Sequence, residues 1–265
     1  MPIEIRPLKT KILQKNFDLA KSLQKALLQN NQKLKNGDVL IMSSKVVALS
    51  QGRVVDLTSL IPSAQNNKFL KRMRYGKGRE DAKMIELIAS EADAVLPGKM
   101  MTTLKDGFLV PSSGIDRSNA PNGSAILWPK NPAKVALQLW KNFKKNTQLK
   151  NLGIVIGDSN CQPLKWGTVG LALAWAGFEG VEDVRGQKDI YGQKLRFTRK
   201  AVADNLVSSA MLIMGEGSEK TPFVLIRGAP VKFTSRQQKK NEIFVKPKGC
   251  VFGGIYSKKF VRLVK

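Results

Sequence analysis

Apolar residues recur along the chain at helical and at strand-like spacings, and the two spacings predict where its elements lie. Positions three and four residues apart predict amphipathic helices over residues 17–34, 79–91, 131–143 and 199–214. Short apolar runs between turn residues predict strands over residues 39–42, 107–114, 152–156 and 222–228. Because strands and helices alternate without a strict βαβ rhythm, the pattern predicts a mixed α/β or α+β fold.

The helix over residues 131–143 carries the clearest start signal. Asn131 is expected to cap it, and Pro132 stands at its first position, where proline is favoured. The composition then changes near the C-terminal end, because ten Lys or Arg residues from Lys232 onward face a single acid, Glu242. We therefore expect a main domain over 1–231 and a basic extension over 232–265.

The 265 residues include no histidine, which excludes several kinds of active site. Ser-His-Asp and Cys-His nucleophile systems and imidazole metal sites all need that side chain. Any metal ion must therefore be held by oxygen, which favours magnesium or manganese with phosphate chemistry. Cys161 and Cys250 make neither a disulfide framework nor a zinc site, so we expect a reducing cytoplasm.

The formal net charge of +25 at pH 7 favours anionic partners, such as nucleotides, nucleic acid, acidic metabolites or a membrane surface. The abundance of lysine could equally be compositional drift, and the sequence leaves both explanations open. The longest weakly polar run, residues 168–178, is far too short to cross a bilayer, so we expect no membrane span.

Four loops share one arrangement, in which an apolar segment is followed by small residues and by a group that can meet phosphate or metal. They are Ser43-Ser44-Lys45, residues 112–119 with Asp116 and Asn119, Asp158-Ser159, and residues 214–222 with Glu216 between two glycines. Hard divalent cations prefer carboxylate and hydroxyl oxygens, and glycines let a backbone approach phosphate closely. Each loop alone is explained as well by a turn or a helix end. Three acids on three loops, in a chain without histidine, together predict a carboxylate metal site.

In this order the loops resemble the coenzyme F420-0:L-glutamate ligases, which extend a deazaflavin coenzyme precursor with glutamate using GTP. The resemblance covers residues 1–230, most of the chain. The matching stretches are "GDVLIMSSKVV…QGRVVDL", "SSGIDRSN", "IVIGDSN…GTVGLALAWAGFEGVEDVRGQKDIYGQKL", "AVADNL" and "LIMGEGSEKTPFVLIRG". The last two together are specific, because polar as well as apolar residues fall in place.

The resemblance implies roles for individual residues. Asp116 and Asp158 are the expected ligands of one divalent ion, Mg²⁺ or Mn²⁺, and Ser159 and Glu216 of a second. The nucleotide, GTP or ATP, is expected to contact Ser44, Lys45, Asn119, Gly215, Glu216, Gly217, Ser218 and Thr221. Lys165 remains where the family has an arginine-rich run, and we expect it to act in catalysis beside Asp116 and Asp158. The resemblance also implies a ligase fold of mixed sheets and helices and an intertwined homodimer.

The implied activity is a nucleotide-dependent γ-glutamyl ligase, which joins L-glutamate to an acceptor carboxylate through an acyl phosphate. Two departures put the acceptor in question. Leu49 and Gln51 stand where the family usually has lysine and glutamate, and Thr221-Pro222 resembles a bacterial branch proposed to add glutamate to folates. We therefore expect a folate-like acceptor slightly ahead of a deazaflavin-like one.

Further side chains are candidates for holding the substrates. Lys45 and Arg185 are expected to orient phosphate or the acidic acceptor. The aromatic residues Trp166, Trp175 and Tyr191 are candidates for a wall against a planar acceptor, although core packing is the favoured explanation for each of them.

A second function from another class is a basic nucleic-acid-binding protein without catalysis. The extension over 232–265 interleaves lysines with aromatic rings on which bases could stack: Phe233, Phe244, Phe252, Tyr256 and Phe260. A nucleic-acid binder needs one continuous basic face, whereas a ligase needs its acids grouped in a cleft. We expect the ligase.

Overall fold

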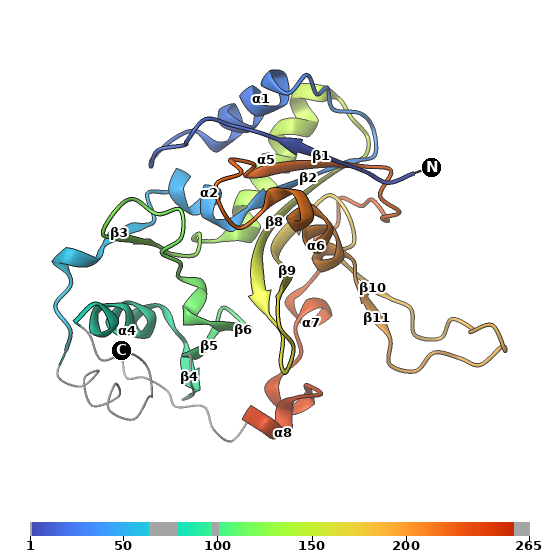
Figure 1. Cartoon of the computed structure of the whole chain (residues 1–265). Helices are drawn as coiled ribbons and strands as arrows, with labels where there is room; N and C mark the ends of the chain where they lie inside the picture. The colour runs from blue at the N-terminus through green and yellow to red at the C-terminus, as the bar shows by residue number, and fades with distance from the viewer. Residues whose placement is uncertain (1, 64–78, 97–100, 257–265) are drawn as a thin grey trace. The chain divides into compact units, whose positions relative to one another are not determined.

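The computed structural model describes residues 2–63, 79–96 and 101–256, and the chain divides into two compact units (Figure 1). The first unit holds Met1–Gln51 and Pro129–Ile243, and the second holds Gly52–Trp128 and Phe244–Lys265. Both combine helices with strands, which confirms the predicted α+β class. The compositional boundary after residue 231 stays a prediction, and residues 257–265, with Phe260, lie outside the described residues.

The first unit is built on a five-stranded mixed sheet with the strand order β1-β12-β2-β8-β9. Strands β2 and β8 run parallel, and the other neighbouring pairs are antiparallel. The apolar runs that predicted strands explain why these segments are buried. The bounds are β1 Glu4–Leu8, β2 Asp38–Ser43, β8 Leu152–Cys161, β9 Thr168–Ala176 and β12 Phe223–Arg227.

Helices α2, α5 and α6 of the first unit pack against the sheet (Figure 1). The bounds are α1 Leu19–Gln29, α2 Ser44–Ser50, α5 Pro132–Thr147, α6 Val202–Met214 and α7 Lys240–Ile243. Helix α6 packs on one face, where Val207 joins a core with Val39, Val155 and Phe178. Helix α5 packs against β8 and β9 through Trp140, whose indole N–H donates to the carbonyl of Leu152 (2.9 Å).

The start of α5 differs from the prediction in one detail. Asn131 stands at the N-cap position and Pro132 follows it, as expected, but the Asn131 side chain makes no capping hydrogen bond. Its backbone is left-handed (φ 49°, ψ 53°) rather than extended, and side-chain caps need the extended form.

A buried ion pair links β2 to β12 at the start of β2. Asp38 is fully buried, and Arg227 donates to both of its carboxylate oxygens, each at 2.8 Å. The hydrogen bond to Asp38 raises the pKa of Arg227 above its ordinary value. Because both charges are satisfied in a bidentate pair, the contact favours one alignment of the two strands.

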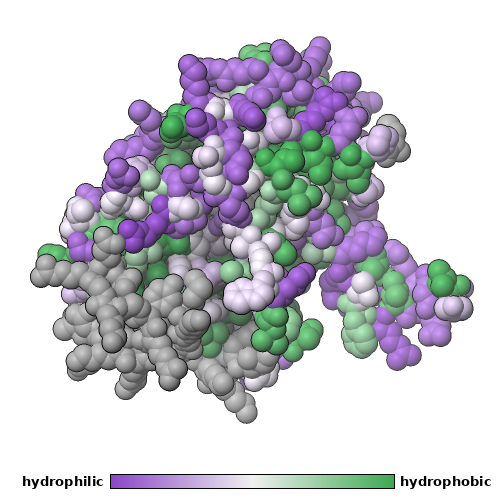
Figure 2. All heavy atoms as spheres, in the orientation of Figure 1, coloured by the Kyte–Doolittle hydropathy of each residue, from purple (hydrophilic) through white to green (hydrophobic). Residues whose placement is uncertain are grey.

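An arm extends from the first unit beyond the short antiparallel pair β10 (Val181–Asp183) and β11 (Arg199–Ala201), as Figure 1 shows. Three large apolar side chains on it are exposed, Ile190, Tyr191 and Phe197, and Figure 2 shows the hydrophobic atoms of the arm in green. These side chains have no core to enter within the first unit.

The base of this arm is held by the basic extension. The carboxamide oxygen of Gln238 accepts hydrogen bonds from the backbone N–H groups of Gly180 (2.8 Å) and Val181 (3.0 Å) and from the indole of Trp175 (3.2 Å). Its amide nitrogen donates to the carbonyl of Val181 (2.7 Å). The first part of the extension is therefore an ordered part of the first unit.

Among its described residues, the second unit contains two small sheets and the 13-residue helix α4. Strand β3 pairs with β7, and β4, β5 and β6 form an antiparallel sheet. The bounds are β3 Val54–Asp56, β4 Ala94–Leu96, β5 Thr102–Lys105, β6 Phe108–Pro111, β7 Ser124–Ile126, α4 Arg79–Glu91 and α8 Gly253–Tyr256. Three single turns of 3-10 helix complete it: η1 Leu57–Ser59, η2 Ser112–Gly114 and η3 Pro247–Gly249.

The core of the second unit gathers Ile85 and Ile88 of α4 with Leu57, Val95 and Leu127. Among the described residues of the whole chain, no helix has the length and apolar character needed to span a membrane.

Candidate active site

Three of the four predicted loops meet where strands β2 and β8 end, in the first unit. The last residues paired between the parallel strands β2 and β8 are Ser43 and Gly157, so Ser44 and Asp158 both follow the end of this ladder. The third loop reaches the same place, because the Ser43 N–H donates to the carbonyl of Pro222 (3.0 Å), just before β12. Ligands of open α/β sheets bind at the carboxyl ends of parallel strands.

The loop after β2 turns directly into α2. The Ser43 hydroxyl accepts from the Lys45 N–H (3.3 Å) and caps the helix. Ser44 is buried and Lys45 is half-buried, so neither side chain is a freely solvated loop residue.

The hairpin of β8 and β9 is held by close contact with α6. Strand β9 is an edge strand, and its outward N–H groups at Gly170 and Ala172 donate to Ser208 Oγ (2.9 Å) and Asp204 Oδ1 (2.7 Å) of α6. Asp204 and Ser208 are four residues apart, about 6 Å along the helix axis, and Gly170 and Ala172 are two residues apart, about 6.8 Å along the strand. Because the two spacings are similar, both side chains of α6 can accept from alternate N–H groups of β9. A Cβ atom at Gly170 would lie 2.2 Å from the backbone nitrogen of Ser208, so only glycine permits this approach.

Strand alternation separates Asp158 from Ser159. A Cβ atom at Gly157 would lie 2.4 Å from Val207 of α6, which places Gly157, and Ser159 two residues later, on the α6 face. Asp158 and Asn160 therefore belong to the opposite face. The Ser159 N–H donates to Asp158 Oδ1 (2.9 Å) beyond the last residue paired with β2, so this carboxylate lies at the free edge of β8.

Glu216 lies on the α6 side of the same hairpin. Its Oε1 accepts from the Thr168 hydroxyl (3.3 Å), and Thr168 shares a strand face with Gly170. Ser159 pairs with Gly170 across the hairpin. Ser159 and Glu216, the predicted ligands of one ion, are therefore on the same side of β8 and β9.

The glycine-rich loop after α6 is organised by an acid that the sequence did not single out. Glu219 Oε2 accepts from the Gly217 N–H (2.8 Å), and a Cβ atom at Gly215 (φ 71°) would lie 2.1 Å from the Glu219 carboxyl carbon. Thr221 is buried, and its hydroxyl donates to the carbonyl of Glu219 (3.2 Å). Ser218 is exposed on the same loop.

The fourth predicted loop belongs to the second unit. The carboxylate of Asp116 accepts from the N–H and from the hydroxyl of Ser118, both at 2.7 Å. Its backbone exchanges two hydrogen bonds with Ile126 (3.0 and 2.8 Å), and Asn119 follows in a left-handed conformation (φ 57°). Asp116 is therefore fixed by its own loop and by the last residue of β7.

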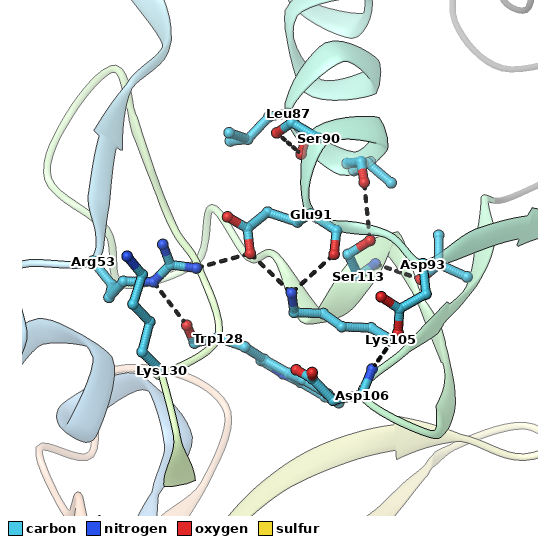
Figure 3. A network of polar contacts seen from close by, with 12 residues as sticks. Arg53, Leu87, Ser90, Glu91, Asp93, Lys105, Asp106, Ser113, Trp128 and Lys130 are labelled. Atoms are coloured by element: carbon cyan, nitrogen blue, oxygen red, sulfur yellow. Dashed lines mark hydrogen bonds and ion pairs between the residues drawn. The ribbon is translucent and has the colours of Figure 1, made fainter. Parts of the chain in front are cut away.

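A strained turn leads into this loop. Ser112, Ser113 and Gly114 all have positive φ (52°, 55° and 69°), which is costly for the two serines. Ser113 is fully buried; its N–H donates to Thr103 Oγ1 (2.8 Å) and its hydroxyl to the carbonyl of Ile88 (3.0 Å), as Figure 3 shows. These buried hydrogen bonds offset the strain.

An ion-pair network supports the same region of the second unit (Figure 3). Arg53 and Lys105 both donate to Glu91 Oε2, at 2.8 and 2.9 Å, and Arg53 Nε donates to the carbonyl of Trp128 (3.1 Å). Burial raises the pKa of Glu91, but the hydrogen bonds and charges of Lys105 and Arg53 outweigh burial and leave this pKa below its ordinary value. The carboxylate therefore stays ionised and ties α4 to β5.

The predicted metal ligands are divided between the units. Asp158, Ser159 and Glu216 lie in the first unit and Asp116 in the second, so their convergence stays a prediction. Within the part of the chain that the structure describes, no group of three or more His, Cys, Asp or Glu residues is placed to hold a metal ion.

Comparison with known proteins decides the family. The sequence model described as F420-0:Gamma-glutamyl ligase matches residues 7–228. The chain belongs to this family. The matched part includes all four loops and ends before the basic extension begins.

Several relatives of this γ-glutamyl ligase family carry the name coenzyme F420:L-glutamate ligase. The one from Methanocaldococcus jannaschii is 36% identical over 203 residues, which is 76% of this chain and 79% of the relative. The one from Methanopyrus kandleri is 32% identical over 229 residues, 85% and 86% of the two chains. The one from Archaeoglobus fulgidus is 31% identical over 234 residues, 87% and 90% of the two chains.

The structure defines the positions of Gln51 and Lys165. Gln51 departs from the usual γ-glutamyl ligase pattern, and Lys165 is the cation that remains of the arginine-rich run. Gln51 donates to the carbonyl of Lys130 (2.9 Å) and accepts from the Lys130 N–H (2.8 Å), so its carboxamide has a structural partner. Lys165 lies exposed on the turn between β8 and β9, beside the exposed Trp166. A catalytic role for Lys165 stays a prediction.

The remaining candidates are Arg185 and Trp175, near the base of the arm, and Tyr191, farther out on the arm. Arg185 Nε donates to Asp183 (2.8 Å), and this hydrogen bond holds the pKa of Asp183 well below its usual range. Trp175 is half-buried against Gly180, which agrees with core packing. Tyr191 is exposed, and a contact with an acceptor stays a prediction for both rings.

The carboxylate of Asp204 gives a pH-dependent test of the α6 contact. Burial raises its pKa above the ordinary value of 3.8, against the hydrogen bond from Ala172, so ionisation costs the folded state stability as the pH rises from 3.8 through the raised pKa. We expect the stability of Asp204→Asn relative to the unaltered chain, measured as the difference between their free energies of unfolding, to be greater at pH 7 than at pH 4, because the amide keeps the oxygen and removes the charge. Guanidinium unfolding at both pH values measures it.

The matched control is Asp204→Leu, which removes the oxygen and leaves the Ala172 N–H unsatisfied. It should lower stability at both pH values, by about 1–3 kcal/mol. Equal differences at pH 4 and pH 7 for Asp204→Asn would contradict the buried, charge-penalised carboxylate.

Proposed function

We propose that this protein is a nucleotide-dependent γ-glutamyl ligase that joins the amine of L-glutamate to an acceptor carboxylate. One observation carries the proposal: the Ser44 loop, the Asp158 loop and the glycine-rich loop adjoin at the carboxyl end of the β2–β8 pair. Membership in a ligase family supports this function over the nucleic-acid-binding alternative, which rested on net charge and on the lysines and aromatic residues of the basic extension.

The reaction has two steps. An oxygen of the acceptor carboxylate attacks the γ-phosphorus of GTP or ATP, the bond to the β–γ bridging oxygen breaks, and an acyl phosphate and GDP or ADP form. The neutral amine of L-glutamate then attacks the acyl carbon. The amide forms as inorganic phosphate leaves with the bonding electrons, and the amine loses one proton. No covalent protein nucleophile is required, which agrees with the absence of histidine.

The donor set fits one or two divalent ions of the Mg²⁺ or Mn²⁺ type. Asp116 and Asp158 offer carboxylates for one ion, and Ser159 with Glu216 offers a hydroxyl and a carboxylate for the other; all are the oxygen ligands that such ions prefer. When bound, the ions would offset the negative charge of the nucleotide phosphates. The separation of Asp158 and Ser159 onto opposite strand faces supports two positions rather than one.

The other residues would position the nucleotide. The Gly217 N–H, which donates to Glu219, belongs to a loop whose glycines at 215 and 217 allow close approach to phosphate. Ser44, Ser218, Thr221 and Asn119 would supply further polar contacts. Lys45 and Lys165 would supply positive charge to the phosphates and to an anionic acceptor.

Replacing one carboxylate by its amide tests the site directly. We expect Asp158→Asn to lower ligation by about 10²–10³-fold or more, on the scale of a lost electrostatic contact in a transition state, because the charge that holds the cation is gone while the shape remains. Ligation is measured by mass with Mg²⁺ or Mn²⁺, GTP or ATP, L-glutamate and acceptor.

The control is Asp106→Asn, at an exposed left-handed position (φ 52°) that asparagine adopts readily. It should keep full activity. A folded Asp158→Asn enzyme that ligates at the unaltered rate would refute the mechanism.

The acceptor is an anionic molecule that ends in a carboxylate. The names of the relatives support the deazaflavin precursor of coenzyme F420, whereas Leu49, Gln51 and Thr221-Pro222 are the reasons to test a folate as well. We expect direct competition of the two acceptors, under identical metal and nucleotide conditions, to give glutamate addition to at least one.

Product mass identifies which acceptor was extended. Addition to the deazaflavin precursor with none to tetrahydrofolate would remove the folate expectation that the sequence departures suggested. Addition to neither acceptor would remove the main support for a ligase. A cytoplasmic location stays a prediction.

We also propose that the protein is a homodimer, as the sequence resemblance implied. The exposed Ile190 and Phe197 of the arm support this, because large apolar side chains on a projecting hairpin commonly mark a protein contact (Figure 2). We expect light scattering to give twice the chain mass, and Ile190→Ser combined with Phe197→Ser to shift the protein toward monomer. The exposed Leu212 of α6 provides the control, since Leu212→Ser should leave the dimer intact. A monomeric unaltered protein would contradict the proposal.

A further inference from the structure

One buried polar atom next to the site has no partner. The side-chain oxygen Oδ1 of Asn160 is buried, and it is the single buried side-chain nitrogen or oxygen without a hydrogen bond among the described residues. An unsatisfied buried acceptor costs about 1–3 kcal/mol of stability, and such groups in folded proteins usually mark a ligand, an ion or a strained functional site. Its position on β8 indicates what the partner is.

Asn160 follows Asp158 by two residues on β8, so the two side chains share the strand face away from α6. Pairing with β2 ends at Gly157, and both residues lie beyond that point. On the other side β8 remains paired with β9, where Asp158 faces Leu171 and Asn160 faces Val169. Both partners are apolar, so neither side chain gains a hydrogen-bond donor from the side chain across the hairpin.

The unpaired Asn160 oxygen and the Asp158 carboxylate place two oxygen acceptors on the same strand face. An amide oxygen can be satisfied by an N–H or O–H donor or by a cation. Because Oδ1 is buried, a bare divalent ion, which is smaller than a water molecule, fits beside it more readily than an ammonium group of about the size of water. Asn carbonyl oxygens are ordinary ligands of hard divalent ions, together with carboxylates.

We propose that Asn160 Oδ1 is an oxygen ligand of the divalent ion that Asp158 holds, so that Asp158 and Asn160 bind one ion from adjacent positions on the same strand face. The inference rests on the proposed function for the presence of that ion, and it adds a ligand that the sequence pattern did not assign. Binding the ion satisfies the oxygen, whereas the metal-free protein retains an unsatisfied acceptor at this position.

The proposal predicts opposite effects of one substitution on two measurements. Asn160→Leu keeps a similar volume and removes the oxygen. It should weaken Mn²⁺ binding to the full-length protein, without nucleotide, by about tenfold or more, as read by titration calorimetry and by the electron paramagnetic resonance signal of free Mn²⁺. In EDTA its midpoint of thermal unfolding should equal or exceed that of the unaltered chain, because the buried unsatisfied oxygen is gone.

Three variants make the result decisive. Asn205→Leu, on the exposed surface of α6, makes the same change where no ligand is expected and should leave Mn²⁺ affinity unchanged. Asn160→Asp keeps an oxygen and adds charge, so it should bind Mn²⁺ at least as tightly as the unaltered chain and unfold at a lower temperature in EDTA. Asn160→Ser, which is smaller and polar, repeats the affinity test if the leucine variant does not fold.

The outcomes separate this inference from the proposed function. Unchanged Mn²⁺ affinity in Asn160→Leu, with affinity lost in Asp158→Asn, would overturn the role of Asn160 and leave the metal-dependent ligase standing. Unchanged Mn²⁺ affinity with a raised KM for L-glutamate would assign the oxygen to the amino acid instead. Tight Mn²⁺ binding that depends on Asn160, in a protein without ligation, would support the metal ligand and refute the ligase.

Discussion

The backbone of α6 lies directly against the β8–β9 hairpin, and the half of the candidate site in the first unit depends on this approach. Gly157 and Gly170 permit it, because a Cβ atom at either position would overlap Val207 or Ser208. Asp204 and Ser208 accept hydrogen bonds from the outward N–H groups of β9. Without these acceptors, β9 would be an open edge of the sheet. The hairpin can therefore continue beyond the end of β2 and present side chains that no third strand covers.

The part of β8 beyond Gly157 carries polar side chains on both of its faces. From Leu152 to Gly157, the residues on both faces of β8 are buried. Beyond Gly157, the next three residues, on both faces, are polar and only partly buried. Asp158 and Asn160 lie on one face, and Ser159 lies on the α6 face with Glu216. The glycine-rich loop that bears Glu216 follows α6 directly, so the helix that supports the hairpin also leads into the loop that carries the proposed ligand Glu216. Helix α6 therefore both supports the hairpin and determines where the Glu216 loop begins.

The sequence predicted much of this arrangement, and its failures have physical causes. The apolar run ending at Asp158 identified β8, because a buried strand and its polar end are both local signals. The strand β9 was not identified, since its alternating Gly and Ala residues lack the β-branched and aromatic side chains typical of strands. The role of Asp204 was not predicted either. Its partner is a backbone N–H on a distant strand, and only the matching "AVADNL" run marked the segment.

The noncontiguous second unit was not predicted either, because Gly52–Trp128 is inserted between parts of the first unit and local sequence patterns do not show which distant segments pack together. Within that unit, Asp116 is positioned by a strained turn rather than by a packed helix. Ser112 and Ser113 adopt left-handed conformations that cost energy, and the turn persists because the buried Ser113 bonds to Thr103 and to the carbonyl of Ile88. The Asp116 loop therefore takes its shape from contacts inside its own unit. The Asp158 strand end takes its shape from α6. Each carboxylate is thus positioned by contacts within the folded chain, so the cost of ordering both loops is met by folding and would not have to be met by the binding of a ligand.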